Sequence, residues 1–153
     1  MPNYRNILDG SDVTLLTGAN LDGLADGALV VGSATNFSTD GKILGTPMIE
    51  AAFAGTTTAG AQIECWWIKS TDGTKFETSD VVPTRAPDFV FSVLPKTGAN
   101  TQVLAAQGPD MSPYVEIPSC QAKLAMRPNG TGSNFASGTG SLVWVRLHTI
   151  GTV

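Results

Sequence analysis

The chain has 153 residues, of which 42% are hydrophobic and only 14% charged, with a formal net charge of −4. This length favours one domain with a real core, and the scattered acidic residues leave no basic patch, which argues against nucleic acid as a partner. No apolar run approaches the roughly 18–20 residues that cross a membrane. The N-terminal run MPNYRNILDG lacks the pattern of a signal peptide, so we expect synthesis and folding in the cytoplasm.

Residues 1–8 show no hydrophobic period and predict an N-terminal arm, which places the folded domain at 9–153. From there, apolar runs of period two alternate with turns rich in glycine and proline, a pattern that predicts about eight to ten strands and no convincing helix. The expected strands cover 13–16, 28–35, 48–54, 62–70, 88–94, 102–107, 114–117, 120–127 and 141–150. One domain of that many antiparallel strands predicts an all-β fold, and the uneven loops favour a jelly-roll-like antiparallel β-sandwich over a simple barrel.

The densest apolar run lies in the stretch 60–82, GAQIECWWIKSTDGTKFETSDVV. We expect a β-hairpin here, with Asp72-Gly73 in the turn and a return arm that begins at Lys75, because Asp-Gly adopts positive φ readily. The adjacent Trp66 and Trp67 must point to opposite faces of a strand. The first arm is therefore either a central strand covered on both faces or a strand with one face kept for a partner.

A search for chemistry predicts no catalytic residue, no cofactor and no metal site. The single histidine, His148, ends the last expected strand, and we expect it to be a solvated surface residue. We expect Cys65 to be a buried, reduced thiol and Cys120 to be free as well, and their spacing matches no metal site. The acidic candidates are expected to form turns or to face solvent; they are Asp9, Asp12, Asp22, Asp26, Glu50 and Glu64.

The placement of two aromatic residues is more informative. Trp66 and Trp144 both fall opposite the more apolar alternation of their strands. Three explanations stand side by side: the rings bind sugars, they are covered by a second subunit, or a long loop of the same chain packs over them.

Three segments carry a resemblance to a known class of protein. They are the run DGSDVTLLTGANLDGLADGALVVGSA, the motif WWIKSTDGTKF and the closing run SLVWVRLHTI. Together with the strand before the motif, they resemble small virion proteins of tailed bacteriophages over residues 9–35, 48–78 and 141–150. The members compared are head decoration (cement) proteins, which have a jelly-roll-like fold and sit as trimers outside the capsid. The resemblance implies a structural, non-enzymatic protein of the capsid surface, made in the cytoplasm of a bacterial host.

We therefore expect a capsid decoration protein that forms a homotrimer and stabilises the shell by bridging subunits of the major capsid protein. The residues expected at its interfaces are Tyr4, Arg5, Ile7, Leu8, Trp66, Trp144 and Arg146. The alternative is a carbohydrate-binding β-sandwich of a phage tail or surface fibre, with Trp66 or Trp144 as the stacking platform. An enzyme ranks third.

Overall fold

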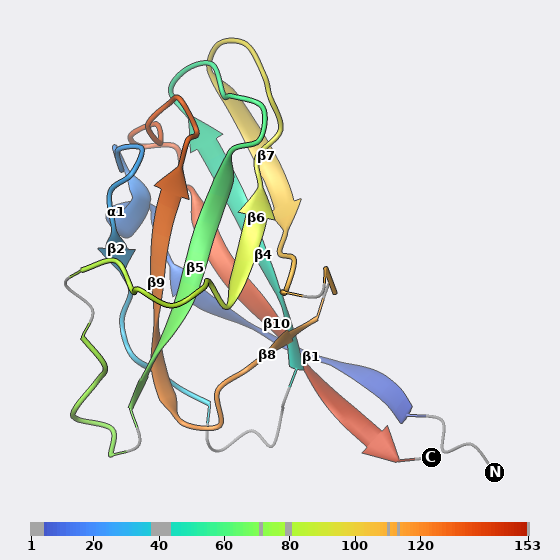
Figure 1. The fold of residues 1–153 in the computed structure, drawn as a ribbon. Coiled ribbons are helices and arrows are strands. Elements are labelled where there is room, and N and C mark those ends of the chain that lie inside the picture. Colours follow the sequence, from blue (N-terminus) through green and yellow to red (C-terminus); the bar gives the residue numbers. More distant parts are fainter. Residues whose placement is uncertain are drawn as a thin grey trace.

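The computed structural model describes residues 5–37, 44–70, 72–78, 81–109, 111–112 and 114–152. Two five-stranded antiparallel sheets pack face to face as a β-sandwich (Figure 1). Sheet A has the order β1-β10-β4-β7, with β8 beside β4, and sheet B has the order β2-β9-β5-β6, with β3 beside β9. The expectation of a single antiparallel β-sandwich is confirmed.

The strands have these bounds: β1 Arg5–Leu16, β2 Val30–Val31, β3 Thr35–Asn36, β4 Leu44–Phe53, β5 Gln62–Ser70, β6 Phe89–Ser92, β7 Asn100–Ala105, β8 Val115–Glu116, β9 Gln121–Asn129 and β10 Leu142–Thr152. A short helix, α1, covers Gly18–Leu21. The pairings are nested, since β1 pairs with β10, β2 with β9, β4 with β7 and β5 with β6. The two halves of the chain therefore run antiparallel along each other as they wind through both sheets.

The core lies between the sheets because the strands direct alternate, mostly apolar side chains inward. Sheet A directs Ile49, Val143, Val145 and Leu147 inward, each at 0% exposure. Sheet B supplies a second row of buried residues, namely Ile63, Cys65, Trp67, Phe89, Phe91, Leu124 and Met126. Val143, Val145 and Leu147 thus form the inward face of β10, and Leu124 and Met126 lie on the inward face of β9.

Aromatic rings pack against one another at the centre of this core. Trp67 meets the edge of Phe37 at a ring-centroid distance of 5.6 Å and meets Phe89 at the same distance. Such contacts stabilise by about 0.5–1.5 kcal/mol each beyond the area they bury. Trp67 therefore belongs to the inter-sheet core, and its neighbour Trp66 must face the outside of sheet B.

The expected turn at Asp72-Gly73 is confirmed, but the segment expected to pair with β5 after that turn is wrong. β5 lies between β9, with which it pairs along its whole length, and β6, which pairs with Gln62–Cys65 only. Residues 72–78 form no strand. The turn itself has Gly73 at a φ of 76°, as expected. β5 pairs with β9 and not with the segment after the turn, because β9 has a longer apolar alternation. The residues after the turn pack against the outer face of sheet B instead.

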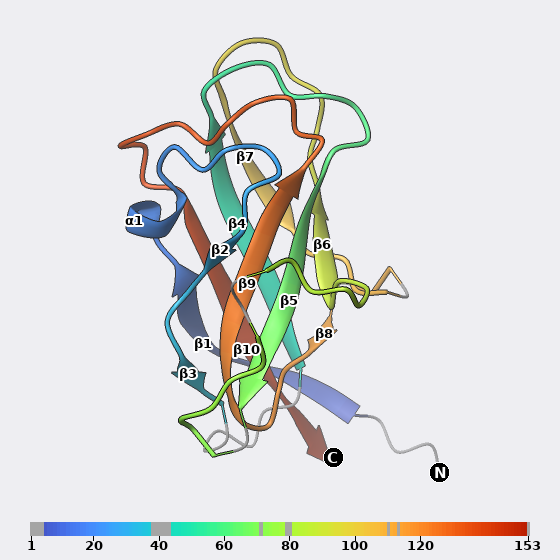
Figure 2. The same cartoon turned by 60° about the vertical axis from the view of Figure 1, so that its left-hand side comes forward.

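The two ends of the described chain leave the sandwich together. Figures 1 and 2 show the first part of β1 and the last part of β10 running out of the body side by side. Their register joins Arg5 to Thr152 and Asp9 to His148. We call this pair, residues 5–9 of β1 and 148–152 of β10, the terminal ribbon. The expected boundary between an arm at 1–8 and a domain at 9–153 falls inside β1, whose pairing with β10 shifts register between Asp9 and Asp12.

Candidate functional surfaces

The outer face of sheet B is covered by the chain itself. Trp66, Ile68 and Ala125 form a buried cluster on this face, and Phe76 and Val82 pack against it from the connection between β5 and β6. We call the described residues of this connection, 76–78 and 81–88, the covering segment. Leu29 and Val31 complete the cover from the β2 side.

Trp66 is consequently 2% exposed, and its indole Nε1 donates to the main-chain oxygen of Arg85 at 3.0 Å. Of the three explanations for this ring, packing under a loop of the same chain is the one observed. The expectation that Trp66 is an exposed interface residue or a stacking platform is wrong for this structure, because its own chain occupies the surface that a partner would need.

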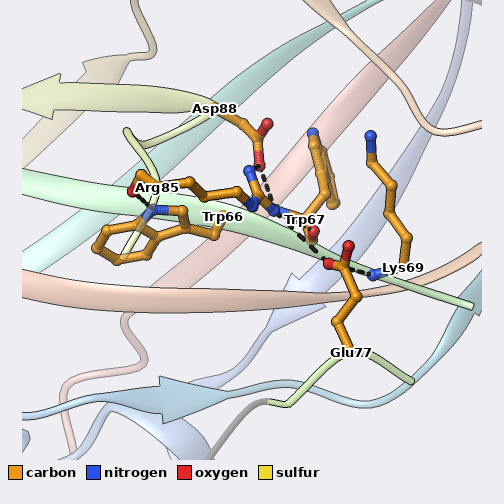
Figure 3. A network of polar contacts seen from close by, with 6 residues as sticks. All are labelled: Trp66, Trp67, Lys69, Glu77, Arg85 and Asp88. Atoms are coloured by element: carbon orange, nitrogen blue, oxygen red, sulfur yellow. Dashed lines mark hydrogen bonds and ion pairs between the residues drawn. The ribbon is translucent and has the colours of Figure 1, made fainter. Parts of the chain in front are cut away.

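A polar network fastens the covering segment to β5 (Figure 3). The Trp67 amide donates to Asp88 Oδ2 at 2.7 Å, and Arg85 donates to that same oxygen at 2.8 Å and to the Trp67 carbonyl at 2.6 Å. Further along, the Lys69 amide donates to Glu77 Oε2 at 3.2 Å, and the Glu77 amide donates to the Lys69 carbonyl at 3.1 Å.

These bonds lie where β6 has stopped pairing. The last β5–β6 pair joins Cys65 to Phe89, so the backbone of Trp67 and Lys69 would otherwise present unpaired groups at the sheet edge. Side chains of Asp88, Arg85 and Glu77 take the place of a neighbouring strand. Sequence reasoning missed this network, although the i,i+3 spacing of Arg85 and Asp88 was its visible signal.

The outer face of sheet A is different, because its tryptophan lines an open hollow and belongs to no buried cluster among the described residues. In the strand register, Trp144 of β10 stands between Thr14 of β1 and Met48 of β4. Trp144 is half-buried, while Thr14 is exposed. A hollow of about 330 Å³ opens here, lined by Thr46, Met48, Trp144, Arg146 and His148.

Arg146 and Asp12 form a two-pronged ion pair at this face. Arg146 Nε donates to Asp12 Oδ1 at 2.8 Å, and Nη2 donates to Oδ2 at 3.1 Å. The hydrogen bond from Arg146 lowers the pKa of Asp12 below its usual value. Both side chains remain about half exposed, at 49% and 46%, so the pair adds little stability but fixes the direction of two polar groups beside Trp144.

His148 is not the solvated surface residue that the sequence suggested. It is 5% exposed, its Nε2 lies 2.8 Å from Thr46 Oγ1, and its ring meets the edge of the Tyr114 ring at 5.5 Å. Tyr114 from the β8 region covers it, a long-range contact that alternation along β10 does not reveal. The histidine therefore forms part of the wall of the hollow.

The remaining expected interface residues lie at the terminal ribbon or outside the described chain. Arg5, Ile7 and Leu8 pair through their backbones with Thr152, Ile150 and Thr149. Tyr4 falls outside the described residues.

The other chemical candidates serve structure. Glu64 accepts from Arg127 at 2.8 Å on the outside of sheet B, whereas Glu50 is exposed on sheet A. Asp26 accepts from two backbone amides of the loop after β9 and thereby holds a turn. Cys65 is buried and free, as expected, and Cys120 is free and half-buried.

Among the described residues, no group of three or more His, Cys, Asp or Glu side chains could hold a metal ion. No helix in that part of the chain is long and apolar enough to cross a membrane. Comparison with protein-family models, with curated proteins and with solved structures gave no match.

Proposed function

We propose that the protein is a structural component of a bacteriophage virion that binds the outside of the head as a decoration protein. Two features support this proposal beside the resemblance of the sequence segments. The main strand orders 1-10-4-7 and 2-9-5-6, with their nested pairs, support the expectation of a jelly-roll-like fold. The second feature is the terminal ribbon, and it carries the proposal.

The terminal ribbon is a two-stranded element that extends beyond the sandwich in both views (Figures 1 and 2). An isolated two-stranded ribbon is only marginally stable in water. β1 also ends the strand order of sheet A, and among the described residues no strand pairs with its outer edge. Such an edge gains stability when a second protein supplies a surface or a strand.

The partners we propose for the ribbon are the major capsid protein and two further copies of this chain in a homotrimer. Arg5, Ile7 and Leu8 belong to the element that makes these contacts. The mechanism is mechanical: each copy bridges neighbouring capsid subunits and adds contact area, for which a stable interface needs about 800 Å² per partner.

The test uses heads of the encoding phage that lack the protein, together with the full-length chain and a variant without residues 1–8. We expect the full-length chain to sediment with the heads and to be a trimer by light scattering. The shortened chain should lose head occupancy while its sandwich keeps the same melting temperature, because the core lies elsewhere. A full-length monomer, or a shortened chain with full occupancy, contradicts the proposal.

The alternative function, a carbohydrate-binding module, now depends on Trp144 alone, because Trp66 is covered. The specific observation in its favour is the hollow beside Trp144 on sheet A.

A further inference from the structure

We propose that the outer face of sheet A carries a binding site for a neutral saccharide, in which a pyranose ring stacks on Trp144. The site adds a second role to the attachment that we assign to the terminal ribbon. It is formed by residues of β1, β4 and β10, and His148 is the residue that it shares with the terminal ribbon.

Trp144 has the position that a stacking platform requires. It lies in the middle of sheet A, with β1 on one side and β4 on the other, so its backbone is rigidly held. The ring is half-buried against Met48 and lines a hollow of about 330 Å³, close to the lower limit of roughly 300–1,000 Å³ for small-ligand sites. One or two sugar rings fit a hollow of that size, and the apolar face of a pyranose suits an aromatic surface.

The groups beside the ring match sugar hydroxyls. Arg146 lies two residues along β10 on the same face as Trp144, and its pair with Asp12 offers donors and acceptors in one fixed arrangement. A carboxylate has about four lone-pair positions, so Asp12 can accept from a hydroxyl while it holds Arg146. Thr46, which pairs with Arg146 in the register, adds a hydroxyl that also lies 2.8 Å from His148 Nε2.

The charges of this face favour a neutral ligand over an anionic one. Asp12 and Arg146 balance each other, while Glu50 and Glu116 are exposed on the same face according to the strand register. Uronic and sialic acids would therefore be repelled. Binding to a neutral saccharide should also depend little on salt.

A second copy of the chain fits the face less well than a saccharide. The centres of subunit interfaces are depleted of acidic residues, yet Asp12 pairs with Arg146 beside Trp144 here. The contrast with sheet B supports this choice, since its cluster around Trp66 is buried under the covering segment. The face at Trp144 combines one aromatic platform with polar neighbours.

The fluorescence of Trp144 provides the experiment. Trp66 and Trp67 are 2% and 1% exposed, so acrylamide should quench Trp144 far more than the other two. We titrate the full-length chain with neutral hexasaccharides of glucose, mannose, galactose and N-acetylglucosamine, and with a hexamer of galacturonic acid. At least one neutral hexamer should protect Trp144 from acrylamide in a saturable way, whereas the acidic hexamer should bind more weakly.

All variants are compared by calorimetry, since the two Trp144 variants lack the reporter ring. Trp144→Ala should lose about tenfold or more in affinity, and Trp144→Phe should retain part of it. Asp12→Asn should also weaken binding. Val103→Ala is the matched control, because Val103 is 62% exposed on the same face but does not line the hollow. Its affinity should equal that of the unaltered chain.

Several results would overturn the site. They are the absence of protection by every neutral hexamer, equal affinity of Trp144→Ala, and quenching of Trp144 that falls as protein concentration rises, which would mean that another copy covers the face. The proposal on capsid binding fails separately: removal of residues 1–8 should leave saccharide binding unchanged, and Trp144→Ala should leave head occupancy unchanged.

Discussion

Replacement of Asp88 by alanine tests whether side chains close the edge of β5. Asp88 Oδ2 accepts from the Trp67 amide at 2.7 Å and from Arg85 at 2.8 Å. Without it, an amide in a residue that is 1% exposed loses its partner, which costs about 1–3 kcal/mol. The ion pair to Arg85 adds less than about 1 kcal/mol, because the guanidinium side chain is 41% exposed. We expect the free energy of unfolding to fall by about 2 kcal/mol.

Urea denaturation measures this change, with an expected fall in midpoint at an unchanged m-value. For a chain of this size, the melting temperature should fall by roughly 4–8 °C. Hydrogen exchange at the Trp67 amide should accelerate as well. Glu77→Gln is the matched control: Glu77 is 51% exposed and glutamine still offers an oxygen to the Lys69 amide, so its cost should stay within about 0.5 kcal/mol. Equal effects of the two substitutions would refute the closing role of Asp88.

Three further outcomes can be measured. Gly73→Val should cost more than about 1 kcal/mol, because φ is 76° and the new Cβ would lie 3.0 Å from a side chain of β9; an unchanged melting temperature would contradict the turn. The Cys65 thiol should react with a thiol reagent only after unfolding, since burial raises its pKa, and rapid labelling of the native protein would contradict its placement. Amides of Lys75 and Thr74 lower the pKa of Asp72 from 3.8 to about 2, so its contribution to stability should be present above pH 4 and lost as the pH falls toward 2. Melting curves of Asp72→Asn should lack that part of the acid dependence.

The sequence predicts the sandwich well where each strand has one buried face. Val143, Val145 and Leu147 recur at every second position, and all three are fully buried. A shift by one residue would turn this whole row toward solvent, so the pattern determines both the strand and its orientation. The same reasoning explains the success at Leu124 and Met126 of β9.

Pairing between distant strands is where local signals fail. Asp72-Gly73 predicts a hairpin, and a turn does form, but β5 takes β9 as its neighbour from more than 50 residues away in the register Ser70 to Gln121. The strand that pairs with β5 depends on how much apolar surface both sheets bury together, and a short stretch of sequence does not contain that information. The hydrogen bond from the Trp67 amide to Asp88 and the burial of His148 under Tyr114 likewise join residues that are far apart in the sequence.

The two outward tryptophans should respond differently to the same substitution. In sequence they look alike, since each opposes the apolar alternation of its strand. Trp66→Ala removes a ring that is 2% exposed and leaves the Arg85 carbonyl without its indole donor, so we expect a cost of about 3–5 kcal/mol.

Trp144→Ala removes a half-buried ring that no described segment covers, so its cost to folding should be less than half of that. Urea denaturation of both variants decides the matter. If the covering segment is a loose loop that leaves readily, both substitutions will cost the same, and the distinction between the two faces of the sandwich falls. If only Trp66→Ala lowers the free energy of unfolding strongly, Trp66 stabilises the fold, and Trp144 is the ring that remains available to a ligand.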